Sequence, residues 1–302
     1  MTIPPPDPEN NFIRDLQLSS LLVTPERALM VSPFSGGVRS SKGFSRLGWF
    51  ITMVDVITSD PAMAACRPDW TATQDLSLWA TGWLREGPAV VDARLLRMGK
   101  RTITVQADIY DGLGFDDFEI FQARIDNTAN EASLPKVARG LVTFVRIPGA
   151  AASGEGIEDY NPANWIGQLR LASREDFRPG VIEDWIGLQL IDAETGRVEL
   201  PCVPYVANSI GTVSGGVQAV MIEAAAEVMR PGKVATDIQL NFLAQLKKGP
   251  VRTSCRVDRD AHDHSVMQVD IVDAGADDRL LTTATVTLQV PPTHNKNSGL
   301  SL

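Results

Sequence analysis

The second half of this chain repeats the pattern of its first half, and this repeat limits the possible folds more than any other feature. Residues 73–111 align with residues 235–273 at a constant offset of 162, without a gap. The identical pairs are Asp75/Asp237, Leu78/Leu240, Leu84/Leu246, Gly87/Gly249, Pro88/Pro250, Arg94/Arg256, Arg97/Arg259, Gln106/Gln268, Asp108/Asp270, Ile109/Ile271 and Asp111/Asp273. Identities at a fixed spacing indicate two copies of one structural unit.

A second alignment lies upstream, where residues 40–55 match residues 208–223 at an offset of 168. In the second copy, residues 214–229 are rich in alanine, lack proline and predict a helix. Alternating β-branched residues between turn signals then predict four strands, at 234–246, 251–259, 265–272 and 280–290. We therefore predict an α+β fold of two tandem units, each with a central helix wrapped by an antiparallel sheet.

The 302 residues are enough for two domains of ordinary size. We expect the first unit at 12–148, a linker at 149–184 and the second unit at 185–292. The second unit begins with a predicted hairpin at 187–200, whose turn reads DAETG. The first unit carries an insertion at about 112–137.

Each predicted helix carries an acid seven residues after a glycine. The first helix (residues 46 to about 59) is apolar in every direction, which is typical of a buried helix, yet Asp55 lies in its middle. A buried carboxylate is costly unless it is paired or functional. Glu223 occupies the matching position in the second helix. Two alternatives stay open: backbone N–H groups satisfy Asp55, or Glu223 shares a solvated helix face with Glu227.

Two glycines at the start of the second helix suggest a chemistry. Gly215 and Gly216 lie where backbone N–H groups have no partner within the helix and where the helix dipole is positive. Glycine lets a carbonyl oxygen approach those donors closely. A carbonyl held there beside a helix-borne acid suits acyl hydrolysis.

These residues resemble the hotdog superfamily, and specifically the PaaI-like acyl-CoA thioesterases. The pattern of that family is Asn-x-x-Gly-x-x-His-Gly-Gly, followed by a helix that carries Asp or Glu. Here it is represented by Asn208, Gly211, Ser214, Gly215, Gly216 and Glu223. Serine therefore stands where the family has histidine. The resemblance covers most of residues 187–290 and extends more weakly over residues 22–148.

The resemblance implies an acyl-CoA thioesterase and gives roles to individual residues. Glu223 would be the general base or nucleophile, Gly215 would supply an oxyanion-type N–H, and Asn208 would position the carbonyl or the water. In this family each site lies between two units, which implies that Thr73 faces Glu223 from the first unit. Asp55 would mark a second place, which is either degenerate or a site of altered selectivity; degeneracy is favoured because its helix has Leu-Gly in place of the glycine pair and Ser40 in place of the asparagine.

Coenzyme A enters this reading as part of the substrate, and no further cofactor is expected. Its phosphates need cations. The candidates lie in the turn RMGKR, which contains Arg97, Lys100 and Arg101, and in KKGP, which contains Lys247 and Lys248. Basic turns on an acidic protein are also commonly just solvated.

Other function classes lack their residues in this sequence. The three histidines, at 262, 264 and 294, lie outside both predicted helices, which argues against a hotdog dehydratase or hydratase. His262 and His264 lack further ligands at a suitable spacing, so no metal is expected. There is no G-x-S-x-G nucleophile elbow and no dinucleotide or P-loop fingerprint. The remaining alternative is a non-catalytic acyl-CoA-binding or lipid-binding protein of the same fold.

Charge and composition set the expected partners. A formal net charge of −9 argues against nucleic acid and anionic membranes. Three widely spaced cysteines fit a reducing compartment, and the first residues, MTIPPPDPENN, lack the features of a signal peptide. No apolar run is long enough to span a membrane. We expect a cytoplasmic protein that forms a homodimer of double hotdogs; a monomeric mass in light scattering would contradict the dimer.

Overall fold

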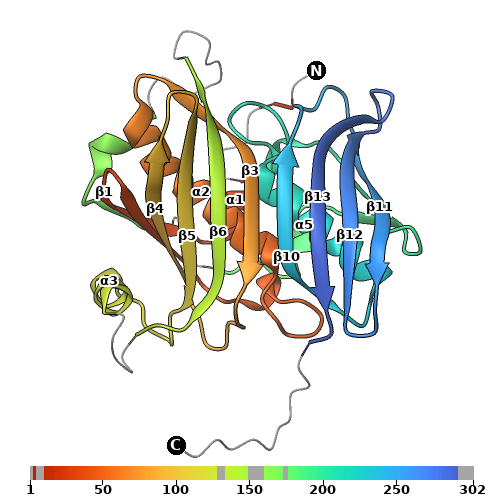
Figure 1. The fold of residues 1–302 in the computed structure, drawn as a ribbon, viewed down its shortest axis with the longest axis horizontal. Helices are drawn as coiled ribbons and strands as arrows, with labels where there is room; N and C mark the ends of the chain where they lie inside the picture. Colours follow the sequence, from red (N-terminus) through yellow and green to blue (C-terminus); the bar gives the residue numbers. More distant parts are fainter. Residues whose placement is uncertain (1–2, 5–9, 128–132, 149–159, 173–175, 292–302) are drawn as a thin grey trace, which may run out of the picture.

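One continuous sheet of 13 strands wraps two long helices in the computed structural model, which describes residues 3–4, 10–127, 133–148, 160–172 and 176–291. The helices lie behind the sheet in the view of Figure 1. The strand order is β7-β1-β2-β4-β5-β6-β3-β10-β13-β12-β11-β9-β8. Neighbouring strands pair in antiparallel fashion throughout. The predicted α+β double hotdog is confirmed.

The first unit follows the order expected of a helix and the strands that wrap it. Its elements are α1 (Phe12–Asp15), β1 (Ser19–Thr24), β2 (Arg27–Ser32), η1 (Gly36–Val38), α2 (Leu47–Cys66), β3 (Trp70–Ala80), β4 (Ala89–Met98), β5 (Thr102–Asp111), α3 (Phe118–Asp126) and β6 (Lys136–Ile147). Buried and half-buried residues alternate along most of β5, because successive side chains of a strand point to opposite faces.

The second unit repeats this order. It contains α4 (Ile182–Trp185), β8 (Gln189–Asp192), β9 (Arg197–Leu200), η4 (Pro204–Val206), α5 (Gly215–Met229), β10 (Val234–Phe242), β11 (Val251–Asp260), β12 (His264–Asp273) and β13 (Arg279–Gln289). The segment between the units contains η3 (Pro162–Trp165) and β7 (Leu169–Arg170), and β7 pairs with β1. Part of the predicted linker, at 149–159 and 173–175, lies outside the described residues, and the domain limits stay predictions.

The two units meet at strands β3 and β10 in the middle of the sheet (Figure 1). Ser77 pairs with Gln239, its equivalent in the repeat, while Asp75 pairs with Asn241 and Trp79 with Asp237. Equivalent residues therefore exchange places across this pairing. The sheet pairing relates the two units by an approximate two-fold axis, as in an isologous dimer made within one chain.

The central helices run antiparallel and cross closely at small residues. A Cβ atom built on Gly48 would lie 2.8 Å from Val220, and one on Gly216 would lie 2.2 Å from the hydroxyl of Thr52. Only glycine permits this approach. The helix α2 is longer than predicted: it continues through Pro61 to Cys66 instead of ending near residue 59. It is buried along most of its length, and tertiary packing outweighs the cost of an internal proline.

The insertion in the first unit forms a separate layer. Helix α3 packs through Phe121 and Ile125 on Leu29 and Val90 of the sheet, in a cluster distinct from the main core. Within the described residues, no helix is both long and apolar enough to cross a membrane.

Candidate functional site

Each helix-borne acid lies at the N-terminus of the other unit's helix. Glu223 of α5 is next to Leu47 and Gly48, where α2 begins. Asp55 of α2 is next to Gly215, where α5 begins. The antiparallel crossing produces this exchange, because the middle of each helix passes the start of its partner. The two places are equivalent by the repeat, yet their contents differ.

The Glu223 place is closed by its own side chains. The backbone N–H groups of Leu47 and Gly48 donate to the two carboxylate oxygens of Glu223, at 3.0 and 2.8 Å. Arg46 lies beside this carboxylate and forms ion pairs with Glu227, at 2.7 Å, and with Glu183. Glu223 is 2% exposed. Burial raises its pKa to about 8, against the opposing effect of Arg46. The N–H donors that could hold a substrate oxygen are therefore occupied.

The Asp55 place is open. The hydroxyl of Thr73 donates to Asp55 Oδ1 at 2.8 Å, and Oδ2 faces Gly215, where a Cβ atom would lie 2.7 Å from it. Within the described residues, no hydrogen bond takes up the backbone N–H of Gly215 or Gly216. Burial raises the pKa of Asp55, while the Thr73 hydroxyl acts in the opposite direction.

A cavity of about 740 Å³ extends from Asp55. Its volume is within the range of small-molecule sites. The polar side chains that line it near the helix ends include Asp55, Thr73, Asn208 and Gln218. The rest of the lining is mainly apolar and aromatic and includes Val56, Met63, Trp70, Phe144, Tyr160 and Phe242. The cavity thus joins a carboxylate and free N–H donors to an apolar compartment.

The sequence grouped the site residues around Glu223, and the structure corrects that grouping. Thr73, Asn208 and Gly215 line the cavity with Asp55, whereas Glu223 is not among its lining residues. The sequence pattern pairs each acid with the glycines of its own helix, whereas the antiparallel crossing brings each acid to the other helix. The Asp55 place, expected to be degenerate, is the one that opens to the cavity.

Asn208 shapes the loop before α5. Its Oδ1 accepts from the backbone N–H groups of Ile210 and Thr212, at 3.2 and 3.1 Å. Its backbone N–H donates to the backbone carbonyl of Thr212 at 2.8 Å. Ser40 makes the equivalent loop in the first unit, where its hydroxyl accepts from the N–H of Phe44. This asparagine therefore positions the loop that leads to Gly215.

Gln218 is a cavity residue that the sequence reading missed. It lies in the first turn of α5, is 7% exposed, and its amide donates to the carbonyl of Val213 at 2.9 Å. Its oxygen accepts from the hydroxyl of Thr282. These bonds fix the amide at the cavity wall. One signal was available: Gln218 is a polar residue within an apolar helix, and its equivalent in the first helix is Phe50.

The predicted phosphate-binding cations lie in or beside two exposed turns, where strands of the sheet end. Arg97, at the end of β4, precedes the turn that contains Lys100 and Arg101, and Lys247 and Lys248 follow the segment after β10. The first turn contacts the end of β6, since the N–H of Arg146 donates to the carbonyl of Arg101. Both turns lie at the top of the sheet in Figure 1. The first turn leads into β5, whose first residue pairs with the cavity-lining Val145 of β6, and the second turn follows the cavity-lining residues 242–245.

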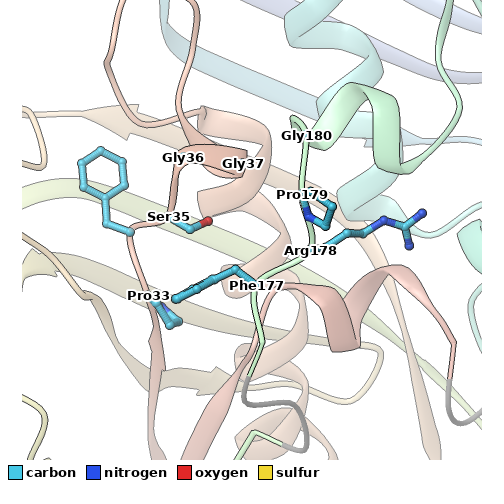
Figure 2. Close-up of a pocket in the computed structure, with 9 residues that line it drawn as sticks. Pro33, Ser35, Gly36, Gly37, Phe177, Arg178, Pro179 and Gly180 are labelled. Carbon is cyan, nitrogen blue, oxygen red and sulfur yellow. The ribbon is translucent and has the colours of Figure 1, made fainter.

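A second hollow, of about 490 Å³, lies between residues 33–37 and 177–180 (Figure 2). Of its lining residues only Arg178 is titratable, and this guanidinium is bound to Asp15 at 2.6 Å. Neither helix-borne acid reaches the hollow. Its lining therefore lacks a group for acid–base chemistry. Within the described residues, no cluster of three His, Cys, Asp or Glu side chains has the geometry of a metal site.

Comparison with known proteins identifies a matching family model and similar folds. A family model described as the acyl-CoA thioesterase N-terminal domain matches residues 204–289. No curated protein sequence matches the chain. Three similar solved structures are a 12:0-ACP thioesterase from Umbellularia californica, a tesB protein from Mycobacterium avium subsp. paratuberculosis and an acyl-ACP thioesterase from Bacteroides thetaiotaomicron.

The likeness to these structures extends over nearly the whole chain. For the Umbellularia protein the TM-score is 0.56 at 7% identity, covering 88% of this chain and 94% of that one. For the Mycobacterium protein it is 0.54 at 11%, covering 93% and 98%. For the Bacteroides protein it is 0.53 at 9%, covering 87% and 98%. At these identities the likeness establishes the fold.

Proposed function

We propose that this chain, whose fold is that of the hotdog thioesterases, hydrolyses acyl-CoA thioesters at one site per chain, with Asp55 as the catalytic carboxylate. The observation that carries the proposal is the open place at Asp55: a carboxylate, a hydroxyl and free helix N–H groups border one cavity. The equivalent place at Glu223 has the same plan, but its donors are already occupied.

The N-terminus of α5 suits the thioester carbonyl. Its oxygen gains negative charge in the tetrahedral transition state, and the N–H groups of Gly215 and Gly216 are positioned to stabilise that charge. The side chain of Gly215 is a single hydrogen atom, which leaves room for the carbonyl beside Asp55. Gln218 is held at the same wall and helps to fix the position of the substrate.

Asp55 acts on water in this proposal. The hydroxyl of Thr73 donates to Oδ1, so that Oδ2 faces the cavity and can accept a proton from a water molecule. The raised pKa of Asp55 makes it a stronger base than an exposed aspartate. Water then attacks the carbonyl carbon, and the coenzyme A thiolate leaves. Direct attack by the carboxylate is the alternative; it would pass through a mixed anhydride of the acyl group with Asp55, which mass spectrometry of rapidly quenched enzyme would detect as acylated protein.

The basic turns suit the phosphates of coenzyme A. The two turns at the top of the sheet contain Lys100, Arg101, Lys247 and Lys248, and Arg97 precedes the first of them. The repeat equivalents of these five residues are Arg259, His262, Asp263, Arg85 and Glu86. Five cations thus correspond to a mixed set that contains two acids. This asymmetry supports anion binding at the open place alone.

A non-catalytic acyl-CoA-binding protein is the second candidate, because it would share the apolar cavity and the basic turns. Thiol release from a panel of acyl-CoAs, measured with purified protein, separates the two. Turnover that exceeds the buffer rate supports the hydrolase. Saturable acyl-CoA binding in calorimetry without any release of thiol would support the binding protein and end the proposal.

A further inference from the structure

We propose that Tyr160, in the segment that joins the two units, forms the end wall of the acyl compartment and limits the length of the acyl chain that the site accepts. This inference rests on the proposed function, since it names the substrate class of the same site. It concerns a residue outside both repeats, in the segment that the sequence suggested was only a linker.

The cavity runs along helix α2 away from the carboxylate. Asp55, Val56, Ser59 and Met63 all line it, and their spacing places them on one face of the helix. The rise from Asp55 to Met63 is about 12 Å along the helix axis. The lining side chains Met63, Trp70 and Tyr160 are apolar or aromatic. An acyl chain whose carbonyl is at the start of α5 would extend in this direction.

Aromatic residues surround the far end of this path. Tyr160 and Trp70 line the cavity together with Met63. The ring of Tyr160 packs edge-on against Trp70, with centroids 5.7 Å apart, and against Trp165, at 5.2 Å. Edge-to-face rings of this kind make a wall of large, stiff side chains.

A buried polar contact fixes Tyr160 in place. Its hydroxyl donates to Asp60 Oδ1 at 2.5 Å, and Asp60 also forms an ion pair with Arg170. Asp60 is 2% exposed and belongs to α2, one residue beyond Ser59. The Arg67 side chain donates to the carbonyl of Tyr160 at 3.2 Å. The wall therefore attaches to the helix that carries the catalytic acid, and its ring cannot swing away without breaking a buried bond.

A fixed wall discriminates between chain lengths. Each methylene group that fits a tight pocket contributes about 1–3 kcal/mol to the binding of the transition state. Methylene groups beyond the wall would have to displace the aromatic cluster. We therefore expect kcat/KM to rise with chain length and then fall sharply.

The test compares kcat/KM for saturated acyl-CoAs, from acetyl to stearoyl, in variants of the full chain. Tyr160→Ala should raise the ratio of kcat/KM for long over short chains by about tenfold or more. Tyr160→Phe keeps the ring and should keep the wild-type length preference. Tyr205→Ala removes a tyrosine that bonds to Asp15 outside the cavity, and serves as a control for the loss of a tyrosine.

A second variant works in the opposite direction; it removes the Ser59 hydroxyl, which bonds to Tyr160, but keeps the bond from Tyr160 to Asp60. Ser59→Leu fills the middle of the compartment and should move the preference toward short chains. Unchanged length profiles in Tyr160→Ala and Ser59→Leu would overturn the proposal; if Tyr160→Ala does not fold, Ser59→Leu decides alone. If the wild type releases no thiol, the proposed function fails, and calorimetric affinities for the same acyl-CoAs still test the wall.

Discussion

One methylene group separates the side chains of Asp55 and Glu223, and their surroundings differ accordingly. The longer Glu223 reaches the N–H groups of the opposite helix and occupies them. The shorter Asp55 bonds to Thr73 and leaves the opposite N–H groups free. Two places that are equivalent in the repeat therefore differ: the Glu223 place is closed by hydrogen bonds, and the Asp55 place is open to the cavity.

At this scale Thr73 has a measurable effect on acidity. Its hydroxyl lowers the pKa of Asp55, which burial raises. The base form of Asp55 is needed for turnover, so activity is lost as the pH falls through this pKa. In Thr73→Val the acid limb of the kcat/KM profile should move to higher pH, because the lowering bond is gone. Thr73→Ser should keep the wild-type limb; an unmoved limb in the valine variant would contradict the contact.

Substitution of Glu223 should change the pH dependence of the free energy of unfolding and leave activity nearly unchanged. The pKa of Glu223 rises from an ordinary 4.5 to about 8 on folding, mainly through burial, so the folded state holds a proton that the unfolded state has lost between these values. The contribution of this group to the free energy of unfolding therefore falls as pH rises from about 4.5 to about 8. Glu223→Gln removes that dependence.

The stability of Glu223→Gln relative to wild type should thus increase across this pH range, as measured by chemical unfolding. The exposed Glu119→Gln on α3 is the control and should give a difference that stays constant with pH. A constant difference for Glu223→Gln as well would mean that Glu223 is ionised in the fold throughout.

Among the elements, the start of α5 leaves little room beside Asp55. A methyl group at Gly215 would lie 2.7 Å from Asp55 Oδ2 and 3.1 Å from Phe242. Gly215→Ala should therefore reduce kcat by about 100-fold or more, the order expected when an oxyanion donor is blocked. Stability should change little, since alanine favours a helix.

Gly232→Ala is the matched control, because a methyl group there meets nothing within 4 Å. It should keep wild-type kcat. Wild-type kcat in Gly215→Ala would show that the carbonyl does not bind at this helix end.

The elements themselves were largely predictable, whereas the partnership between them was not. Strand β12 was expected at 265–272 and is His264–Asp273, because alternation is a local property. Helix α2 ends at Cys66, beyond the predicted end, because burial in the core overrides Pro61. Which helix end an acid faces depends on how two helices cross, and no local pattern encodes this. Arg46, which lies beside Glu223, is likewise close to it only in space.

Over the whole molecule the two-fold plan of the fold is broken by charge. The basic turns have repeat equivalents that include Glu86 and Asp263. In the proposed function, a chain of two units has one open site. The homodimer stays a prediction, and α3 now covers part of the outer face of the first unit.

Charge reversal tests the basic turns. The double variant Lys247→Glu/Lys248→Glu should raise KM for acyl-CoA by about tenfold, the effect of two exposed ion pairs of up to about 1 kcal/mol each. KM for an acyl thioester of N-acetylcysteamine, which lacks phosphates, should not change. Arg85→Glu, at the opposite edge, is the control; an equal effect on both thioesters would exclude a phosphate-binding role.

The most direct test of the whole account compares Asp55→Asn with Glu223→Gln in one thiol-release assay. Both substitutions remove a buried helix-borne carboxylate while they keep its shape, and circular dichroism checks that both variants fold. Loss of a general base predicts that kcat falls about 100- to 10,000-fold in Asp55→Asn. Glu223→Gln should stay within a few-fold of wild type. Full activity in Asp55→Asn with loss in Glu223→Gln would contradict the assignment of the site to Asp55.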